Sequence, residues 1–357
     1  MDRNKIRILF LPPVDKANTN AQSLNTREVA LRLDPERFEV TLFYEEEPDP
    51  RLRNCRNIRL LALPHRVKTI RILKEQLSDY DIVSYMDYSP ASYIFVHLPR
   101  LMRKGTTTVL HAEAPRAQLV NPSILLRVLY DGVFSRCDAH VGITDFVARD
   151  LAHNGDREAR FILPVGVDCR FFSPPAKREH AVPTVLFVGT LVERKGPQFV
   201  VLAAKHFPGA NFRLVGAGRN NFERVLQKQI SDLNLPNVTL EGPRSQYELL
   251  EIMRESEVLL LPSRLEGLPK VSLEAAATGL PCIVFRDYET PSVVDGVTGF
   301  QVSTFEEMLH RLEQLIQGSG LRTRMGSAAR HHAKKFDWDI VSKQWNSAFI
   351  EIAGSSR

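Results

Sequence analysis

Short apolar runs alternate with longer amphipathic stretches through the first half of the chain. The runs have the length of buried strands, and the stretches between them repeat apolar positions every three or four residues. The spacing of Val29, Ala30 and Leu33, for example, predicts a helix over residues 23–33. Strands that alternate with helices form a parallel sheet covered on both faces. Strands are predicted at residues 6–11, 38–44, 82–85, 107–111 and 139–144.

A polar, proline-containing stretch from Ser173 to His180 interrupts this alternation and predicts a linker. The alternation then restarts, so we expect an α/β protein with two Rossmann-like domains. We assign residues 1–174 to the first domain, 175–337 to the second and 338–357 to a terminal helix. Ligands of such sheets bind at the carboxyl ends of the strands, so the two parallel sheets are expected to face an interdomain cleft. In the second domain, strands are predicted at 184–188, 212–215, 238–241, 258–261 and 282–285, and helices at 198–206, 222–233, 247–255 and 271–278.

Composition narrows the class of protein without naming a function. Hydrophobic residues make up 43% and charged residues 25%, which is typical of a soluble globular protein. The net charge of +5 suits an anionic partner such as a nucleotide diphosphate or an acidic membrane surface. The four cysteines lie far apart, so neither a structural zinc site nor a disulfide framework is indicated, and a reducing cytoplasm is expected. No apolar run reaches about 18 residues, the length of a membrane-spanning helix, so any membrane contact is expected to be peripheral.

The stretch 263–281, SRLEGLPKVSLEAAATGLP, is the most informative part of the sequence. It places Glu266 on a loop and Glu274 on the following helix, with seven residues between the two carboxylates. Gly267 and Pro269 break the chain between them, and Pro281 prevents the helix from continuing. Both carboxylates can therefore face one cleft, beside the free N–H groups of the loop-to-helix junction.

A second stretch, GTLVERKG at 189–196, follows the strand predicted at 184–188. It presents Arg194 and Lys195 at the carboxyl end of that strand, where two cations can neutralise a diphosphate leaving group.

These two stretches resemble those of the retaining GT-B glycosyltransferases known as family 4, and the likeness extends over nearly the whole chain. Glu266 and Glu274 look like that family's E-x7-E signature, and 189–196 resembles its phosphate loop. FRLVGAG at 212–218 resembles its Gly-x-Gly turn, DGVTGF at 295–300 its closing element, and LPVGVDCRFFSP at 163–174 the end of its first domain. Residues 338–352 resemble the terminal helix that crosses back onto the first domain.

The resemblance implies a role for each matching residue. Glu274 would bind the ribose hydroxyls, Glu266 the hydroxyls of the donor sugar, and Lys195 the donor diphosphate. His111, at the end of a strand, would lie near the anomeric carbon and position or polarise it. The predicted catalytic residues are thus His111, Lys195 and Glu266. The predicted donor-binding residues are Gly189, Thr190, Arg194, Lys195, Gly216, Gly218, Arg244, Glu266, Gly267, Leu268, Pro269, Lys270 and Glu274, and the predicted acceptor-binding residues are Asn18, Asn20 and Gln22.

The function implied is transfer of a hexose or N-acetylhexosamine from a nucleotide-diphosphate sugar to an acceptor hydroxyl. The co-substrate is a nucleotide sugar, with a UDP-sugar favoured over a GDP-sugar, and no metal or other cofactor is required because fixed cations can serve instead. The acceptor is a glycan, a lipid-linked sugar or a small molecule in cell-surface glycan or glycolipid assembly. The expected location is the cytoplasm, at the inner face of the membrane where membrane contact occurs.

Three departures from the family pattern bear on this interpretation. Thr190 stands where the family usually has arginine, and Ser292 stands where it often has glutamate. The first loop offers Asn18, Asn20 and Gln22 in place of the usual Gly-Gly. Acceptor choice is the property most affected by these changes.

Other interpretations stay open at this stage. A nucleotide-sugar epimerase shares the architecture, and a non-catalytic nucleotide-sugar-binding subunit is compatible with Thr190 and Ser292. His111 has the structural alternative of a core histidine. A zinc deaminase is excluded because Pro281-Cys282 lacks the second cysteine of that motif, and 216–221 lacks the third glycine of a dinucleotide fingerprint. A basic amphipathic stretch, Arg66 to Lys74, suits a solvated helix face or a membrane surface, and no nucleic-acid recognition motif is present.

Overall fold

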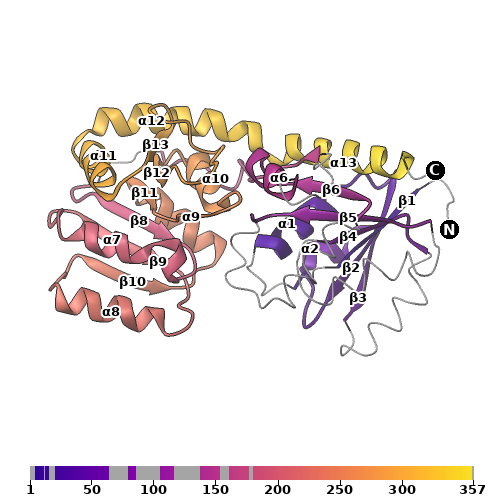
Figure 1. Ribbon diagram of the computed structural model, residues 1–357, viewed down its shortest axis with the longest axis horizontal. Helices are drawn as coiled ribbons and strands as arrows, with labels where there is room; N and C mark the ends of the chain where they lie inside the picture. The colour runs from indigo at the N-terminus through magenta and orange to yellow at the C-terminus, as the bar shows by residue number, and fades with distance from the viewer. Residues whose placement is uncertain are drawn as a thin grey trace. The chain divides into compact units, whose positions relative to one another are not determined.

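The structure is a computed structural model of the chain, which describes residues 5–11, 13–15, 21–63, 79–85, 105–115, 137–152, 161–176 and 180–355. The chain divides into two compact units (Figure 1). The first unit comprises Met1–Val165 together with Asp339–Arg357, and the second is Gly166–Trp338.

The first unit contains a parallel sheet of seven described strands in the order β3-β2-β1-β4-β5-β6-β7. Strands β4, β5 and β6 are buried along their whole length, as expected for a sheet covered on both faces. The strands are β1 Ile6–Phe10, β2 Phe38–Tyr44, β3 Ile58–Ala62, β4 Ile82–Tyr85, β5 Thr107–Ala112, β6 Ala139–Gly142 and β7 Phe161–Ile162. The described helices between them are α1 Ala21–Ala30, α2 Pro50–Arg53 and α6 Asp145–Ala152.

The last helix, α13 Trp338–Gly354, makes its contacts with this first unit. The ring of Phe349 lies edge-on to Phe10 of β1 at 5.8 Å, and Asn346 accepts a hydrogen bond from the Asp34 backbone at 2.9 Å. Figure 1 shows α13, in yellow, lying over the first sheet. Residues from the very end of the sequence therefore complete the core that the first strand begins.

The second unit contains a parallel sheet of six strands in the order β10-β9-β8-β11-β12-β13. Its strands are β8 Thr184–Val188, β9 Asn211–Val215, β10 Val238–Gly242, β11 Val258–Leu261, β12 Cys282–Phe285 and β13 Gly299–Val302. Its helices are η3 Glu193–Lys195, α7 Pro197–Ala204, α8 Phe222–Asp232, α9 Gln246–Arg254, α10 Lys270–Ala277, α11 Phe305–Gln317, α12 Ser319–Ala333 and η4 Lys334–Phe336. A reciprocal capping box of Ser245 and Glu248 begins α9, and Thr304 caps α11. Two parallel-sheet α/β units confirm the predicted fold class.

The division between the units falls at Val165 rather than at residue 174. The segment after Val165 is attached to the second unit by backbone and side-chain hydrogen bonds. Val167 pairs with Asp337, and the Arg330 guanidinium donates to the carbonyls of Cys169 and Phe172, each at 2.7 Å. Gly166 lies so close to Trp338 that a Cβ would be 2.4 Å from its ring. Part of the predicted linker, residues 177–179, lies outside the described residues.

Within the part of the chain that the structure describes, no helix combines the length and the apolar character needed to span a bilayer.

Candidate functional site

Two glycine-containing turns lie against each other at the carboxyl ends of β8 and β9. The Gly189 N–H donates to Val215 O and the Leu191 N–H to Ala217 O, both at 2.9 Å. Gly216 has a φ of +149°, and a Cβ there would lie 1.9 Å from the Gly189 carbonyl oxygen. Only glycine fits this contact, so the backbone approach of the two turns depends on Gly216. Gly218 is similarly confined, because its Cβ would lie 2.6 Å from the Cβ of Glu223.

The loop after β8 is also fixed against the loop after β11. The short helix η3 is followed by Gly196, which has a φ of +74°. A Cβ at this position would lie only 2.4 Å from the Pro262 carbonyl oxygen, so other residues do not fit. The Ser263 hydroxyl donates to the Lys195 carbonyl oxygen at 3.3 Å. These contacts set the two cations of the first loop beside the glutamate of the second.

Lys195, Arg194 and Glu266 meet at one carboxylate oxygen. The distance from Lys195 Nζ to Glu266 Oε1 is 2.8 Å, and that from Arg194 Nη1 to the same oxygen is 3.3 Å. Arg194 also donates to the Leu265 carbonyl oxygen at 2.8 Å. We call these three side chains the Glu266 cluster.

The electrostatics of the Glu266 cluster favour the charged carboxylate. Glu266 is only 8% exposed, and burial by itself raises the pKa of a carboxyl group. The positive charges of Lys195 and then Arg194 outweigh burial and lower the pKa of Glu266 below its ordinary value. Glu266 is therefore ionised at neutral pH, and the cluster carries one net positive charge.

Glu274 has the opposite environment on α10. It is 6% exposed, and burial raises its pKa, with partial compensation from Lys270, whose Nζ lies 3.9 Å from Glu274 Oε1. Among the described residues, the Glu274 carboxylate has no hydrogen-bond donor. A buried acceptor of this kind is free to accept hydrogen bonds from the hydroxyls of a ligand.

The junction between the two glutamates leads directly into α10. Gly267 and Leu268 are buried, while Pro269 and Lys270 are half-buried. Pro269 occupies the N-cap position without a side-chain cap, so the helix start keeps backbone N–H groups that no side chain caps. Together with the two cations, these groups form a positive surface that suits phosphate oxygens.

Residues 171–332 match the family model described as "Glycosyl transferases group 1". The matched residues lie within the second unit.

Similar proteins were found both by sequence and by structure. The chain is 28% identical to a D-inositol 3-phosphate glycosyltransferase of Corynebacterium jeikeium over 256 residues, which is 63% of this chain and 60% of that protein. It is 27% identical to a GDP-mannose-dependent phosphatidylinositol monomannoside mannosyltransferase of Corynebacterium glutamicum over 207 residues, 51% of this chain and 54% of that one. The matches span 54 to 60% of the length of the D-inositol 3-phosphate glycosyltransferases.

Two solved structures show the same fold over nearly the whole chain. Sucrose-phosphate synthase from Thermosynechococcus elongatus superposes with a TM-score of 0.82 at 16% identity, covering 98% of this chain and 100% of that one. Anabaena Alr3699/HepE in complex with UDP and glucose superposes with a TM-score of 0.80 at 16% identity, covering 97% and 100%. The architecture is thus the GT-B fold.

Arg244 and Ser292, both in the second unit, make contacts that the sequence did not indicate. Arg244 lies after β10 and pairs with Glu241 at 3.5 Å and Glu248 at 3.7 Å, so its charge is already balanced locally. The Ser292 hydroxyl is buried, 2.5 Å from the Ser272 hydroxyl of α10. Ser292 therefore makes a buried contact with α10. Thr190, in the first of the two turns, is half-buried.

In the first unit, the structure places His111 in a core. The side chain is fully buried, and its ring lies edge-on to Trp345 of α13 at 4.7 Å. Burial lowers the pKa of His111 to about 3, so the imidazole is neutral at neutral pH. This matches the core-histidine alternative, and the predicted catalytic role remains a proposal.

The polar residues near His111 were missed as candidate site residues. Asn25 of α1 donates to the Glu113 carboxylate at 2.6 Å, and that carboxylate lies 3.9 Å from His111 Nδ1. Gln22 is half-buried in the first turn of α1. Asn18, Asn20 and the basic stretch from Arg66 to Lys74 lie outside the described residues.

Proposed function

We propose that this protein is a retaining glycosyltransferase of family 4 that moves a sugar from a nucleotide-diphosphate donor to an acceptor hydroxyl. The observation that carries the proposal is the Glu266 cluster, in which Lys195 and Arg194 converge on one carboxylate beside two close glycine turns. The turns let a diphosphate approach the backbone, and the two cations stabilise the negative charge that develops on the leaving group.

In this proposal the two glutamates divide the recognition of the donor. Glu274, a buried carboxylate without a donor among the described residues, accepts hydrogen bonds from the ribose hydroxyls. Glu266 accepts hydrogen bonds from the donor sugar once Lys195 turns to the diphosphate. The sugar keeps its anomeric configuration because the acceptor attacks on the face that the phosphate leaves. His111 is fully buried, so in this proposal it acts as a neutral imidazole behind the site and does not serve as an acid.

The donor and acceptor classes are proposed from similar proteins. The UDP bound in the Anabaena structure supports a UDP-sugar as the donor. Because one relative is GDP-mannose-dependent, GDP-sugars are the first alternative donors to compare with UDP-sugars. The relatives named for D-inositol 3-phosphate and phosphatidylinositol mannoside support a hydroxyl of a polyol, glycan or glycolipid as acceptor. We place the reaction in cell-surface glycan or glycolipid assembly, in the cytoplasm at the inner face of the membrane.

The decisive experiment measures sugar transfer from UDP- and GDP-linked hexoses and N-acetylhexosamines with a panel of acceptors. The Lys195→Ala variant should lower kcat/KM about 10- to 100-fold, since a hydrogen bond to a charged group contributes about 1.5–3 kcal/mol. Lys205→Ala is the matched control, because Lys205 is an exposed lysine at the end of α7. Equal activity of both variants would contradict the assignment of the site.

The same assay separates the two alternatives. Epimerised donor formed without any acceptor would indicate a nucleotide-sugar epimerase. Tight donor binding without turnover on any acceptor would indicate a non-catalytic nucleotide-sugar-binding subunit.

A further inference from the structure

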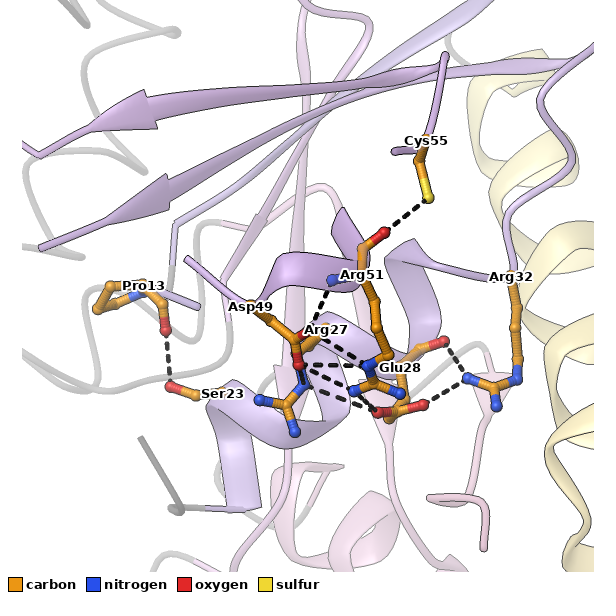
Figure 2. Close-up of polar contacts among 8 residues, drawn as sticks. All are labelled: Pro13, Ser23, Arg27, Glu28, Arg32, Asp49, Arg51 and Cys55. Carbon is orange, nitrogen blue, oxygen red and sulfur yellow. Dashed lines mark hydrogen bonds and ion pairs between the residues drawn. The ribbon is translucent and has the colours of Figure 1, made fainter. Parts of the chain in front are cut away.

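A second group of charged side chains lies in the first unit, and three of its members, Arg27, Glu28 and Asp49, are buried. It joins the middle of α1 to the start of α2 (Figure 2). Asp49 caps α2, and the Glu28 carboxylate of α1 lies beside it. We call the group the Arg27 cluster; its members are Arg27, Glu28, Arg32, Asp49 and Arg51.

Three guanidinium groups and two carboxylates leave the Arg27 cluster with one excess positive charge. The two carboxylates are already well supplied by other arginines. Arg32 Nη1 lies 2.6 Å and Arg51 Nη2 2.7 Å from Glu28 oxygens, and Arg51 also donates to Asp49 at 3.0 Å. The excess charge therefore resides on Arg27.

Arg27 approaches the two carboxylates through one nitrogen only. Its Nε lies 3.1 Å from Asp49 Oδ2 and 3.6 Å from Glu28 Oε1, yet it is buried and its geometry makes no hydrogen bond with either. Its two outer nitrogens make no hydrogen bond to any described residue, and Figure 2 shows them turned away from both carboxylates. Yet the Arg27 side chain is only 7% exposed, compared with 51% for Arg51.

A buried guanidinium with unused donors is costly, because its lost contacts with water are not replaced. The contrast within the cluster shows this cost. Burial lowers the pKa of Arg27, and Asp49 and Glu28 do not compensate fully. For Arg51, burial acts in the same direction, but the hydrogen bonds to Asp49 and the charge of Glu28 raise its pKa. Arg27 is thus the member that an added anion would stabilise.

Arg27 lies near the carboxyl ends of β1 and β2, because its partner Asp49 follows β2 and caps α2. Helix α1 joins the parallel strands β1 and β2, so its first turn lies at their carboxyl ends. The Ser23 hydroxyl donates to Pro13 O, just beyond β1, at 2.7 Å. Ser23 and Arg27 lie four residues apart on one helix face, and a long helical side chain reaches back over the preceding turn.

We propose that Arg27 binds an oxyanion, a phosphate or a carboxylate, carried by the acceptor. Asp49 and Glu28 hold the guanidinium from behind, and its two outer N–H groups form a fork that matches two oxygens of such a group. Gln22, in the first turn of the same helix, is the predicted acceptor residue nearest in sequence. The role of the anion as part of an acceptor rests on the proposed function, whereas anion binding itself does not.

The test measures binding of inorganic phosphate to the full chain by thermal shift at constant ionic strength, with acetate as the carboxylate probe. In the wild type, one of these probes should raise the melting temperature in a saturable way. Arg27→Gln should weaken the apparent Kd at least about tenfold, as expected for two lost charge-assisted hydrogen bonds. Arg53→Gln is the control, because it removes the same charge from an exposed arginine of α2 whose ion pair among the described residues is with Glu47, at 3.8 Å.

Arg27→Met keeps the packing of the side-chain stem and guards against a variant that fails to fold. The titration is repeated in a Lys195→Ala chain, which lacks the main cation of the second unit. A response that survives Lys195→Ala and is lost with Arg27→Gln or Arg27→Met supports the proposal. Four outcomes overturn it: the wild type shows no response, the response is lost with Lys195→Ala, both Arg27 variants retain it, or Arg53→Gln loses it equally. None of these outcomes depends on sugar transfer.

Two further probes identify the source of the anion. Glycerol 3-phosphate, compared with glycerol, tests a soluble phosphate ester, and vesicles of phosphatidylglycerol in phosphatidylcholine test a lipid headgroup. The probe whose binding is lost in Arg27→Gln identifies the source of the anion. If Arg27→Gln binds both probes as well as the wild type does, the proposal is contradicted.

Discussion

Replacing Glu266 by glutamine should separate nucleotide binding from sugar transfer. The substitution keeps the shape of the side chain and removes the charge that holds Lys195 Nζ at 2.8 Å and Arg194 Nη1 at 3.3 Å. Both cations then lack a counter-charge, so a free nucleoside diphosphate should bind more tightly. The amide also forms a weaker hydrogen bond with the donor sugar than a carboxylate does, so transfer should slow.

The magnitudes follow from the burial of the ion pair. A hydrogen bond between charged groups contributes about 1.5–3 kcal/mol, and the Lys195 side chain is 25% exposed, which favours the lower end of that range. Release of this pair should lower the Kd of the nucleotide by about tenfold. The kcat should fall by a similar factor or more, because the sugar contact is lost at the reacting end of the donor.

Isothermal titration with UDP and GDP, together with a transfer assay, measures both effects. Glu306→Gln, on the exposed side of α11, is the matched control and should change neither quantity. A Glu266→Gln variant in which nucleotide affinity and kcat fall together would refute the reasoning, since Glu266 would then not compete with the nucleotide for Lys195.

Three further changes test the surroundings of the site. Glu274→Gln should stabilise the fold at neutral pH by about 0.5–2 kcal/mol and should weaken donor binding. The reason for the stabilisation is that a buried carboxyl with a raised pKa favours folding only in its protonated form, and this contribution is lost as the pH rises. Calorimetry measures the stability, and titration with the donor measures the binding. The pKa of His111 is about 3 in the folded chain and 6.5 for a free histidine, so the free energy of unfolding should fall as the pH decreases from 6.5 to 3. The slope should approach about 1.4 kcal/mol per pH unit. Denaturation curves at several pH values should show this slope in the wild type and not in His111→Leu. Gly216→Ala should lower the free energy of unfolding by about 1–3 kcal/mol and abolish donor binding. Gly209→Ala is the control: a Cβ at this position meets no atom within 4 Å, so stability and binding should stay unchanged. Equal urea midpoints for the two variants would contradict the close contact between Gly216 and Gly189.

The buried strands were predictable because each is a short segment made up mostly of apolar residues. For β2, β4, β8, β11 and β12, the observed strand bounds agree to the residue with the predicted ones, which are 38–44, 82–85, 184–188, 258–261 and 282–285. Three strands were not predicted. The residues of β3 are half-buried or exposed, β7 has two residues, and β13 begins with Gly299, which packs against the backbone of Cys282. Such strands are defined by their neighbours in the sheet and leave little pattern of their own.

The candidate site was predictable to the extent that it depends on strand ends. Lys195 and Glu266 follow β8 and β11, which are adjacent parallel strands, so their proximity follows from the topology. The burial of His111 was not predictable, because it depends on Trp345 from a helix at the far end of the chain. The Arg27 cluster likewise requires α1 to pack on the cap of α2, and the sequence shows only an adjacent Arg-Glu pair within a predicted helix.

The two glutamates of the seven-residue spacing show why a motif and its chemistry are separate questions. Both are less than 10% exposed, and in both burial raises the pKa. Lys195 and Arg194, which come from a different loop, reverse the shift for Glu266, whereas Lys270 at 3.9 Å does not do so for Glu274. Spacing therefore places the two carboxylates on one loop-to-helix junction, and only the packing of the neighbouring loop makes one of them a fixed anion before any ligand binds. In the proposed transfer, the fold therefore positions these charges before the donor binds.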